Sequence, residues 1–251
     1  MEHNEQYTRY FMTLCYDGTG YHGWQIQPHS NSVQEELQKA LSTLLRRPTE
    51  IVGAGRTDTG VHARKMVAHF DHEGVPLDCN QLVYKLNKIL PRDIAVQTVE
   101  PVNGDMHARF SARSRTYHYF LHQTKDPFQR AYSWQMMYGQ LDFEKMNRAA
   151  EILMEYRDFT SFSKVNTDTK TNDCTITEAR WDKVAENQWR STITANRFLR
   201  NMVRAIVGTL VEIGRGRMEI NELRHVIEAK DRCKAGDSVP GNALFLVDVK
   251  Y

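Results

Sequence analysis

Residues 55–63 of this chain read Gly55-Arg56-Thr57-Asp58-Thr59-Gly60-Val61-His62-Ala63, and no other segment restricts the possible folds as strongly. The segment places one carboxylate between two glycines. Glycine adopts backbone torsions that other residues resist, and it lets another segment approach closely. An Asp in such a segment either caps its own turn or presents its carboxylate to a ligand. Because the segment is longer than a turn requires, Asp58 is a candidate catalytic residue.

Length and composition are those of a globular protein. The chain has 251 residues, of which 41% are apolar and 25% charged, and this fits one large α/β unit or two subdomains. No run reaches the length of a membrane span, and the polar first six residues lack the apolar region of a signal peptide. We therefore expect a cytoplasmic protein with no membrane partner. The net charge is only +2, so nucleic-acid binding requires local clusters of basic residues.

The sequence predicts neither a metal site nor a nucleotide cofactor. The four cysteines form no Cys-x-x-Cys pair, and His69 and His72 would face opposite sides of an extended segment. A zinc site needs three or four convergent ligands. A Walker-type phosphate loop is missing, and the segment 53–55 lacks the third glycine of a dinucleotide-binding fingerprint.

Hydrophobic periodicity predicts two similar αβ halves. In the first half we expect strands over 11–16, 66–70 and 94–99, and helices over 33–45 (capped by Ser32) and 82–90. In the second half we expect strands over 116–122, 175–184, 188–195 and 244–249, and helices over 143–153 (capped by Asp142), 198–213 and 221–229. The pattern predicts an α+β fold of two ferredoxin-like subdomains, 1–105 and 106–251, whose sheets join into one extended mixed or antiparallel sheet.

Two sets of arginines have spacings that align their side chains. The first set shares one face of an extended segment, and the second shares one side of the helix expected over 198–213. The members are Arg109, Arg113 and Arg115 in the first set, and Arg197, Arg200 and Arg204 in the second. One such stripe is typical of a solvated face. Two in one chain favour contact with phosphate, whose oxygens match the planar fork of arginine.

Tyr117 and Tyr119 lie on the same odd-numbered face as Arg113 and Arg115. Extruded RNA bases are commonly held against aromatic rings. Tyr117 is therefore either a platform for a base or a core aromatic with a satisfied hydroxyl.

Four segments together resemble the tRNA pseudouridine synthases of the TruA type. They are the segment 16–25 (Tyr-Asp-Gly-Thr-Gly-Tyr-His-Gly-Trp-Gln), the segment 55–63, Arg115-x-Tyr117-x-Tyr119, and the segment 196–204 (Asn-Arg-Phe-Leu-Arg-Asn-Met-Val-Arg). The resemblance extends from the first expected strand to the last. The chain departs from the family's pattern at Thr59, where many members have Ala, and at Ala243, where Gly is common.

The resemblance implies a pseudouridine synthase fold and the isomerisation of uridine to pseudouridine at positions 38 to 40 of the tRNA anticodon stem-loop. It gives Asp58 the catalytic role, as nucleophile or base, with Arg204 paired to it and Tyr117 in the active site. The residues that it implies for substrate binding are Arg56, Arg113, Arg115, Tyr117, Arg200 and Leu244. It implies no cofactor and no metal. The expected partners are tRNA and a second copy of the chain in a homodimer.

Two other functions remain open from the residues alone. A non-catalytic RNA-binding module on ferredoxin-like halves stacks bases on sheet aromatics, but it does not need a glycine-flanked Asp. A glycoside hydrolase usually needs two carboxylates about 5 to 10 Å apart, and the matched segments supply Asp58 alone.

Overall fold

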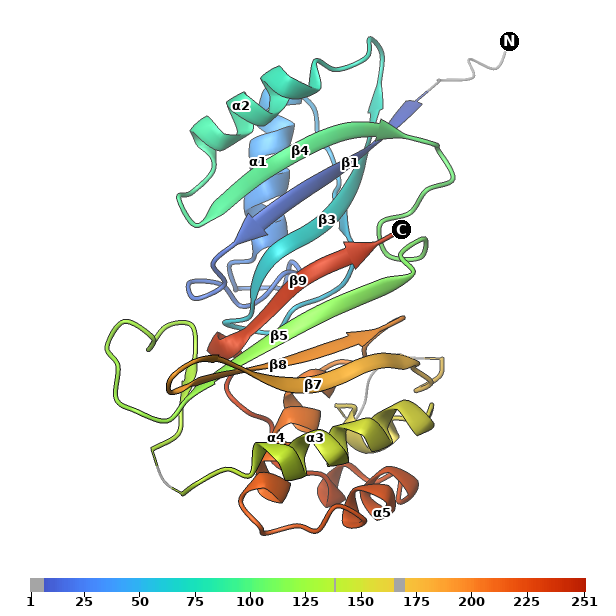
Figure 1. Cartoon of the computed structure of the whole chain (residues 1–251). Helices are drawn as coiled ribbons and strands as arrows, with labels where there is room; N and C mark the ends of the chain where they lie inside the picture. The colour runs from blue at the N-terminus through green and yellow to red at the C-terminus, as the bar shows by residue number, and fades with distance from the viewer. Residues whose placement is uncertain (1–6, 138, 165–169) are drawn as a thin grey trace. The chain divides into compact units, whose positions relative to one another are not determined.

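The computed structural model describes residues 7–137, 139–164 and 170–251 (Figure 1). These residues form nine β-strands and five α-helices, which confirms the expected α+β class with mixed, mainly antiparallel strand pairing. The chain divides into two compact units: unit 1 comprises residues 1–112 and 247–251, and unit 2 comprises residues 113–246. The boundary expected after residue 105 stays a prediction. The polar residues 1–6 lie outside the described part.

Unit 1 is an antiparallel sheet with two helices. Its strands and helices are β1 (Tyr7–Tyr16), α1 (Val33–Leu45), β2 (Val52–Gly53), β3 (His62–Glu73), α2 (Cys79–Ile89) and β4 (Ile94–Val102). Strand β1 lies between β3 and β4, and the short β2 pairs with Ala68 and His69 in the middle of β3. Each expected strand and helix of this half is present, and β3 begins earlier than expected, at His62 within the segment 55–63.

Helices α1 and α2 cover the face of the sheet on which the even-numbered residues of β1 lie; in Figure 1 α1 lies behind the strands. Tyr10, Met12 and Leu14 on that face are at most 1% exposed, as the period-2 alternation of a half-buried strand predicts. The hydroxyl of Ser32 accepts a hydrogen bond from the Glu35 N–H at 3.3 Å, so the predicted cap of α1 is confirmed. Burial of the apolar side is what stabilises helices of this length.

Unit 2 contains the remaining strands and helices. They are β5 (Ser114–His122), β6 (Trp134–Gln135), α3 (Phe143–Ile152), β7 (Ile176–Ala185), β8 (Gln188–Ala195), α4 (Met202–Gly214), α5 (Glu222–Glu228) and the start of β9 (Leu244–Lys250). Strand β8 pairs antiparallel with both β5 and β7, and β6 pairs parallel with β5. The unit boundary falls within β9, whose first three residues belong to unit 2 and the rest to unit 1.

The core of unit 2 lies between its sheet and the helices α3 and α4. Phe143 at the start of α3 stacks on Trp189 of β8, with ring centroids 3.6 Å apart, and Asp142 caps the helix by accepting from the Lys145 N–H at 2.8 Å. Nearly all of α4 is buried. The central position of α4 explains why the sequence is apolar on most of its sides rather than on one stripe.

Two expectations about the arginine sets are wrong. Helix α4 begins at Met202 rather than at residue 198, because Asn201 has a left-handed backbone (φ 69°) that interrupts a right-handed helix. Arg197 and Arg200 therefore do not share a helix with Arg204. Arg109 lies in a turn, where its N–H donates to Nδ1 of His107 at 3.1 Å, so it does not continue the extended segment of Arg115.

Within the described ranges, none of the helices combines the length and the hydropathy that a membrane span requires.

Candidate active site

Asp58 opens a tight turn in unit 1, between β2 and β3. Its carbonyl oxygen accepts a hydrogen bond from the Val61 N–H at 3.1 Å. Gly60, at the third position of this turn, has φ 75°, the left-handed backbone that a type II turn requires there and that glycine adopts without strain. The Asp58 residue is half-buried. Asp58 is therefore a turn residue and is also partly accessible, so the two interpretations of its segment are compatible.

The segment 16–24 fixes the backbone of this turn. The Trp24 N–H donates to the Thr57 carbonyl oxygen at 3.3 Å, and the Gly60 N–H donates to the Tyr21 carbonyl oxygen at 3.3 Å. The hydroxyls of Tyr16 and Thr57 form a buried hydrogen bond of 2.9 Å. The residues on both sides of Asp58 are thus held by groups of the same neighbouring segment.

Two glycines allow this close approach. A Cβ on Gly18 would overlap the carbonyl oxygen of Val61, and a Cβ on Gly23 would overlap that of Thr57. Gly23 also has φ 96°, where side chains are strained. Sequence reasoning used the segment 16–25 only for its resemblance and missed this contact with the Asp58 turn. Its repeated glycines were the available signal.

His62 ties the end of the turn to the same segment. The ring is 1% exposed, and its Nδ1 lies 3.0 Å from the backbone nitrogen of Gly18 and 3.0 Å from Oδ1 of Asp17. His62 is also the first residue of β3. The imidazole therefore joins the start of that strand to the end of β1.

Tyr117 and Tyr119 share one face of β5, as the sequence predicts, but their surroundings differ. Tyr119 is 1% exposed and donates from its hydroxyl to the Pro240 carbonyl oxygen at 3.1 Å. Burial raises the pKa of the Tyr119 phenol above its usual range. Tyr117 is half-buried, and its ring meets that of Phe198 edge to face with centroids 5.1 Å apart. Tyr119 is a core aromatic, whereas Tyr117 keeps part of its surface accessible.

The candidate arginines of unit 2 have different environments. Nε of Arg204, in the first turn of α4, donates to the Val239 carbonyl oxygen at 2.6 Å. Nη1 of Arg115 donates to the Asn196 carbonyl oxygen at 2.8 Å. Arg113 and Arg200 are exposed. Arg204 and Arg115 are therefore oriented by backbone carbonyls.

The candidate residues fall into two groups. Arg56 (exposed) and Asp58 belong to unit 1, and the other six belong to unit 2. Within unit 2, the contacts of Tyr117 and Arg115 connect β5 to the segment 196–201. Leu244 begins β9 and is 5% exposed, which makes it a core residue with a small accessible surface.

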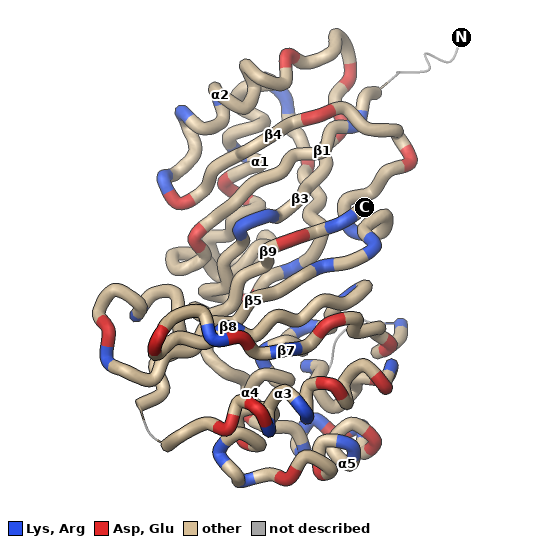
Figure 2. Tube along the Cα trace, in the orientation of Figure 1, with Lys and Arg blue, Asp and Glu red and all other residues tan. Residues whose placement is uncertain are grey.

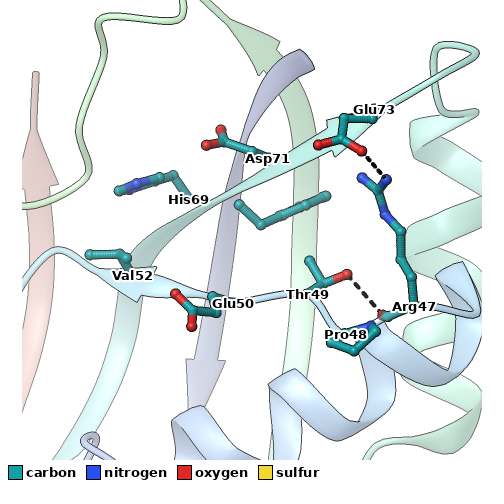
Figure 3. Close-up of a pocket in the computed structure, with 9 residues that line it drawn as sticks. Arg47, Pro48, Thr49, Glu50, Val52, His69, Asp71 and Glu73 are labelled. Carbon is teal, nitrogen blue, oxygen red and sulfur yellow. Dashed lines mark hydrogen bonds and ion pairs between the residues drawn. The ribbon is translucent and has the colours of Figure 1, made fainter. Parts of the chain in front are cut away.

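A separate hollow of about 330 Å³ lies in unit 1 at the β2–β3 edge (Figure 3). Its lining comes from residues 47–52 and 69–73 and does not include the Asp58 turn. Two of its carboxylates are paired with arginines: Glu73 with Arg47 at 3.0 Å, and Asp71 with Arg9 at 2.7 Å. Among the residues described, no group of three or more His, Cys, Asp or Glu side chains is arranged to hold a metal ion.

Basic and acidic residues are interspersed along the helices α3 to α5 of unit 2 (Figure 2). Several of them form ion pairs, such as Arg224 with Glu155 and Arg215 with Glu212. Arg113 and Arg200 are exposed basic positions of this unit, at which a polyanion can make contact.

Sequence from both units of the chain matches one known protein family. Residues 13–111 and 149–251 match the family model of tRNA pseudouridine synthases. The chain therefore belongs to the tRNA pseudouridine synthase family, whose members are isomerases that act on tRNA, and the resemblance seen in the sequence is confirmed.

Three relatives carry the name tRNA pseudouridine synthase A. The chain is 60% identical to that of Bacteroides thetaiotaomicron (97% of this chain, 90% of the relative) and 58% identical to that of Bacteroides fragilis (97% and 96%). It is 41% identical to that of Bacillus subtilis (95% and 97%). The similarity thus covers nearly the full length of each relative.

Proposed function

We propose that this chain isomerises uridine to pseudouridine at positions 38 to 40 of the tRNA anticodon stem-loop, with Asp58 as the catalytic residue. The observation that carries the proposal is the Asp58 turn. Backbone and hydroxyl contacts hold the residues on both sides of the half-buried Asp58, as expected where a catalytic group must meet its substrate in one geometry. We further propose that the enzyme acts in the cytoplasm as a homodimer, in line with the family resemblance.

The reaction breaks the bond between uracil N1 and the ribose, turns the uracil, and joins its C5 to the same ribose carbon; C5 then loses its proton and N1 gains one, so the atoms balance. It therefore needs a nucleophile or base near the ribose, a pocket that retains the free uracil, and extrusion of the nucleotide from its stack. In the proposal Asp58 acts on the nucleotide and Arg204 pairs with its carboxylate. The half-buried ring of Tyr117 stacks on the base.

The remaining candidates contact the tRNA backbone in this proposal. Arg56, Arg113 and Arg200 are exposed, so their guanidinium groups can reach phosphates, which accept paired hydrogen bonds from arginine. Arg115, held at Asn196, and Leu244, at the start of β9, complete the substrate contacts. The proposed chemistry uses side chains alone.

Incubation with unmodified tRNA tests the proposal. Tritium release from uridine labelled at C5 reports isomerisation, while binding without release indicates an RNA-binding module, and free base or sugar indicates a hydrolase. Asp58→Asn should abolish turnover and leave most tRNA affinity, because the amide keeps the shape of the side chain and lacks an ionised oxygen. Thr59→Ala, in the same turn, is the control and should stay active. Substantial tritium release by Asp58→Asn would refute the role of Asp58.

A further inference from the structure

Thr57, the residue before Asp58, is held at two points. Its hydroxyl bonds to the hydroxyl of Tyr16 at 2.9 Å, and its carbonyl oxygen accepts from the Trp24 N–H at 3.3 Å. Thr57 is 8% exposed and Tyr16 is 5% exposed, so water has little access to either group. A side-chain hydrogen bond and a backbone hydrogen bond together fix the torsions of this residue.

Those torsions set the direction in which the Asp58 side chain leaves the backbone. The Asp58 side chain has only two torsions of its own. A rotation of the Thr57 backbone therefore changes the position of the carboxylate directly. Misplacement of a reacting group by about 1 Å can reduce the rate about a hundredfold. A buried hydrogen bond between two hydroxyls also resists rearrangement, because breaking it leaves buried polar groups without that partner.

We propose that Tyr16 is a positioning residue for the reaction: through the Thr57 hydroxyl it holds the backbone from which the Asp58 carboxylate extends. This inference rests on the catalytic role of Asp58 proposed above. Tyr16 does not touch the substrate in this scheme. Its contribution is to the geometry of the turn, so it acts on the rate of the chemical step rather than on tRNA affinity.

Strand β1 supplies a matched control for Tyr16. Tyr10 lies on the same face of the same strand, is 1% exposed, and accepts a hydrogen bond on its hydroxyl from the Leu77 N–H at 3.0 Å. Tyr10→Phe and Tyr16→Phe each delete one buried, hydrogen-bonded hydroxyl and keep the ring. Only the Tyr16 hydroxyl is connected to the Asp58 turn.

The test compares Tyr16→Phe, Thr57→Val, the double variant and Tyr10→Phe at a temperature where thermal melts show all of them folded. We expect kcat to fall about tenfold in Tyr16→Phe and in Thr57→Val, with KM for tRNA within about twofold of the parent. The double variant should lose little more than either single variant, because both remove the same contact. Tyr10→Phe should keep the parental kcat even if its melting temperature falls equally.

An unchanged kcat in both Tyr16→Phe and Thr57→Val would overturn the inference. Equal falls of kcat in Tyr16→Phe and Tyr10→Phe would also overturn it, because the effect would then follow stability alone. Asp58→Asn measured in the same assay separates the two proposals. If Asp58→Asn is inactive and Tyr16→Phe behaves as the parent, the positioning inference fails while the proposed function stands.

Discussion

The turn that carries Asp58 in unit 1 and the segment that carries Arg200 in unit 2 are fixed in different ways. The turn is held by backbone and hydroxyl bonds from residues 16–24, with glycines at the points of closest approach. The segment 196–201 also has backbone bonds, from the Asn196 N–H to the Thr175 carbonyl oxygen at 3.1 Å and from the Lys164 N–H to the Arg200 carbonyl oxygen at 3.0 Å. A side chain adds to them: Oδ1 of Asn196 accepts from the backbone nitrogens of Thr175 and Arg197, each at 2.8 Å.

This difference matches the lengths of the side chains that the two segments present. A short Asp side chain has little freedom to adjust its position. If it is a catalytic group, its backbone must therefore be placed to within a fraction of an ångström. The long side chain of Arg200 can adjust by its own rotations to a phosphate. We therefore expect changes to the backbone of the Asp58 turn to reduce turnover strongly. Changes to single arginine side chains of unit 2 should alter the affinity for tRNA only slightly.

Gly23→Ala should have the largest effect. The new Cβ would overlap the Thr57 carbonyl oxygen at a backbone φ of 96°, so either the turn or the segment 16–24 must move. We expect a loss of about 3 kcal/mol in stability, from strain and overlap together, and about a hundredfold loss of turnover. Chemical denaturation and tritium release measure the two effects.

Gly74→Ala is the matched control for that prediction. Gly74 also has a positive φ (100°), but a Cβ there meets nothing within 4 Å. The Gly74→Ala variant should lose about 1–2 kcal/mol of stability from backbone strain alone. The folded variant should have normal turnover. Equal losses of turnover in the two variants would contradict the view that the Asp58 turn depends on backbone contact.

Acid should weaken unit 1 through His69. Its Nδ1 accepts from the Ala108 N–H at 3.1 Å, and burial first, then the charge of Arg9, lowers the pKa of His69 from 6.5 to about 4. Between these values the unfolded chain binds a proton that the folded chain does not, so stability falls as pH falls from 6.5 toward 4. The loss amounts to roughly 3 kcal/mol at the low end, at about 1.4 kcal/mol per pKa unit.

His69→Asn tests this pH dependence, because its side-chain oxygen can still accept a hydrogen bond but does not titrate. The variant's stability, followed by denaturant unfolding from pH 7 to pH 4, should fall less steeply than the parent's. His29→Asn, at an exposed position with its own positive φ, is the control. Parallel curves for His69→Asn and the parent would show that His69 is not responsible.

Arg204→Lys should lower turnover about tenfold despite keeping the charge. Nε of Arg204 donates to the Val239 carbonyl oxygen at 2.6 Å, and lysine cannot maintain that bond while also presenting a planar fork to a carboxylate. Arg215→Lys, at the other end of α4, is the control. If single-turnover rates of Arg204→Lys equal those of the parent, the proposed pairing with Asp58 is wrong.

The smallest expected effect is on salt dependence. The affinity for tRNA should fall with salt with a log–log slope of about −0.9 for each phosphate contact on duplex nucleic acid. Arg113→Ala and Arg200→Ala should each make the slope less negative, by up to about the value of one phosphate contact. Binding titrations from low to moderate salt measure this. A parental slope in both variants would show that these exposed arginines serve only as solvated surface.

Capping residues and periodic segments could be predicted from the sequence because their causes are local. Ser32 and Asp142 each bond to an N–H three residues ahead. The sequence predicts a start of helix α4 that is too early, because Phe198, Met202 and Ile206 share a helical spacing. In the fold Phe198 instead packs on Tyr117 from the irregular segment between β8 and α4. The left-handed backbone of Asn201 depends on tertiary packing, so no periodicity rule anticipates it.

The sequence indicates the residue types of the candidate site, but it does not indicate the contacts that hold the Asp58 turn in place. The glycine-flanked Asp58 stands out in the sequence, whereas the Tyr16–Thr57 bond joins residues 41 positions apart. A pairing of that kind depends on where β1 ends relative to β3, which is a property of strand register. Similarly, nothing local in Gly23 indicates which carbonyl oxygen lies against it.

The last five residues return to unit 1 after the whole of unit 2 has been completed. There Asp248 pairs with Lys65 at 2.7 Å, and the Tyr251 hydroxyl donates to the Ala108 carbonyl oxygen at 2.7 Å while its ring contacts Phe11. During synthesis on the ribosome, this part of the surface of unit 1 therefore stays uncovered until residues 247–251, which follow unit 2, have been made.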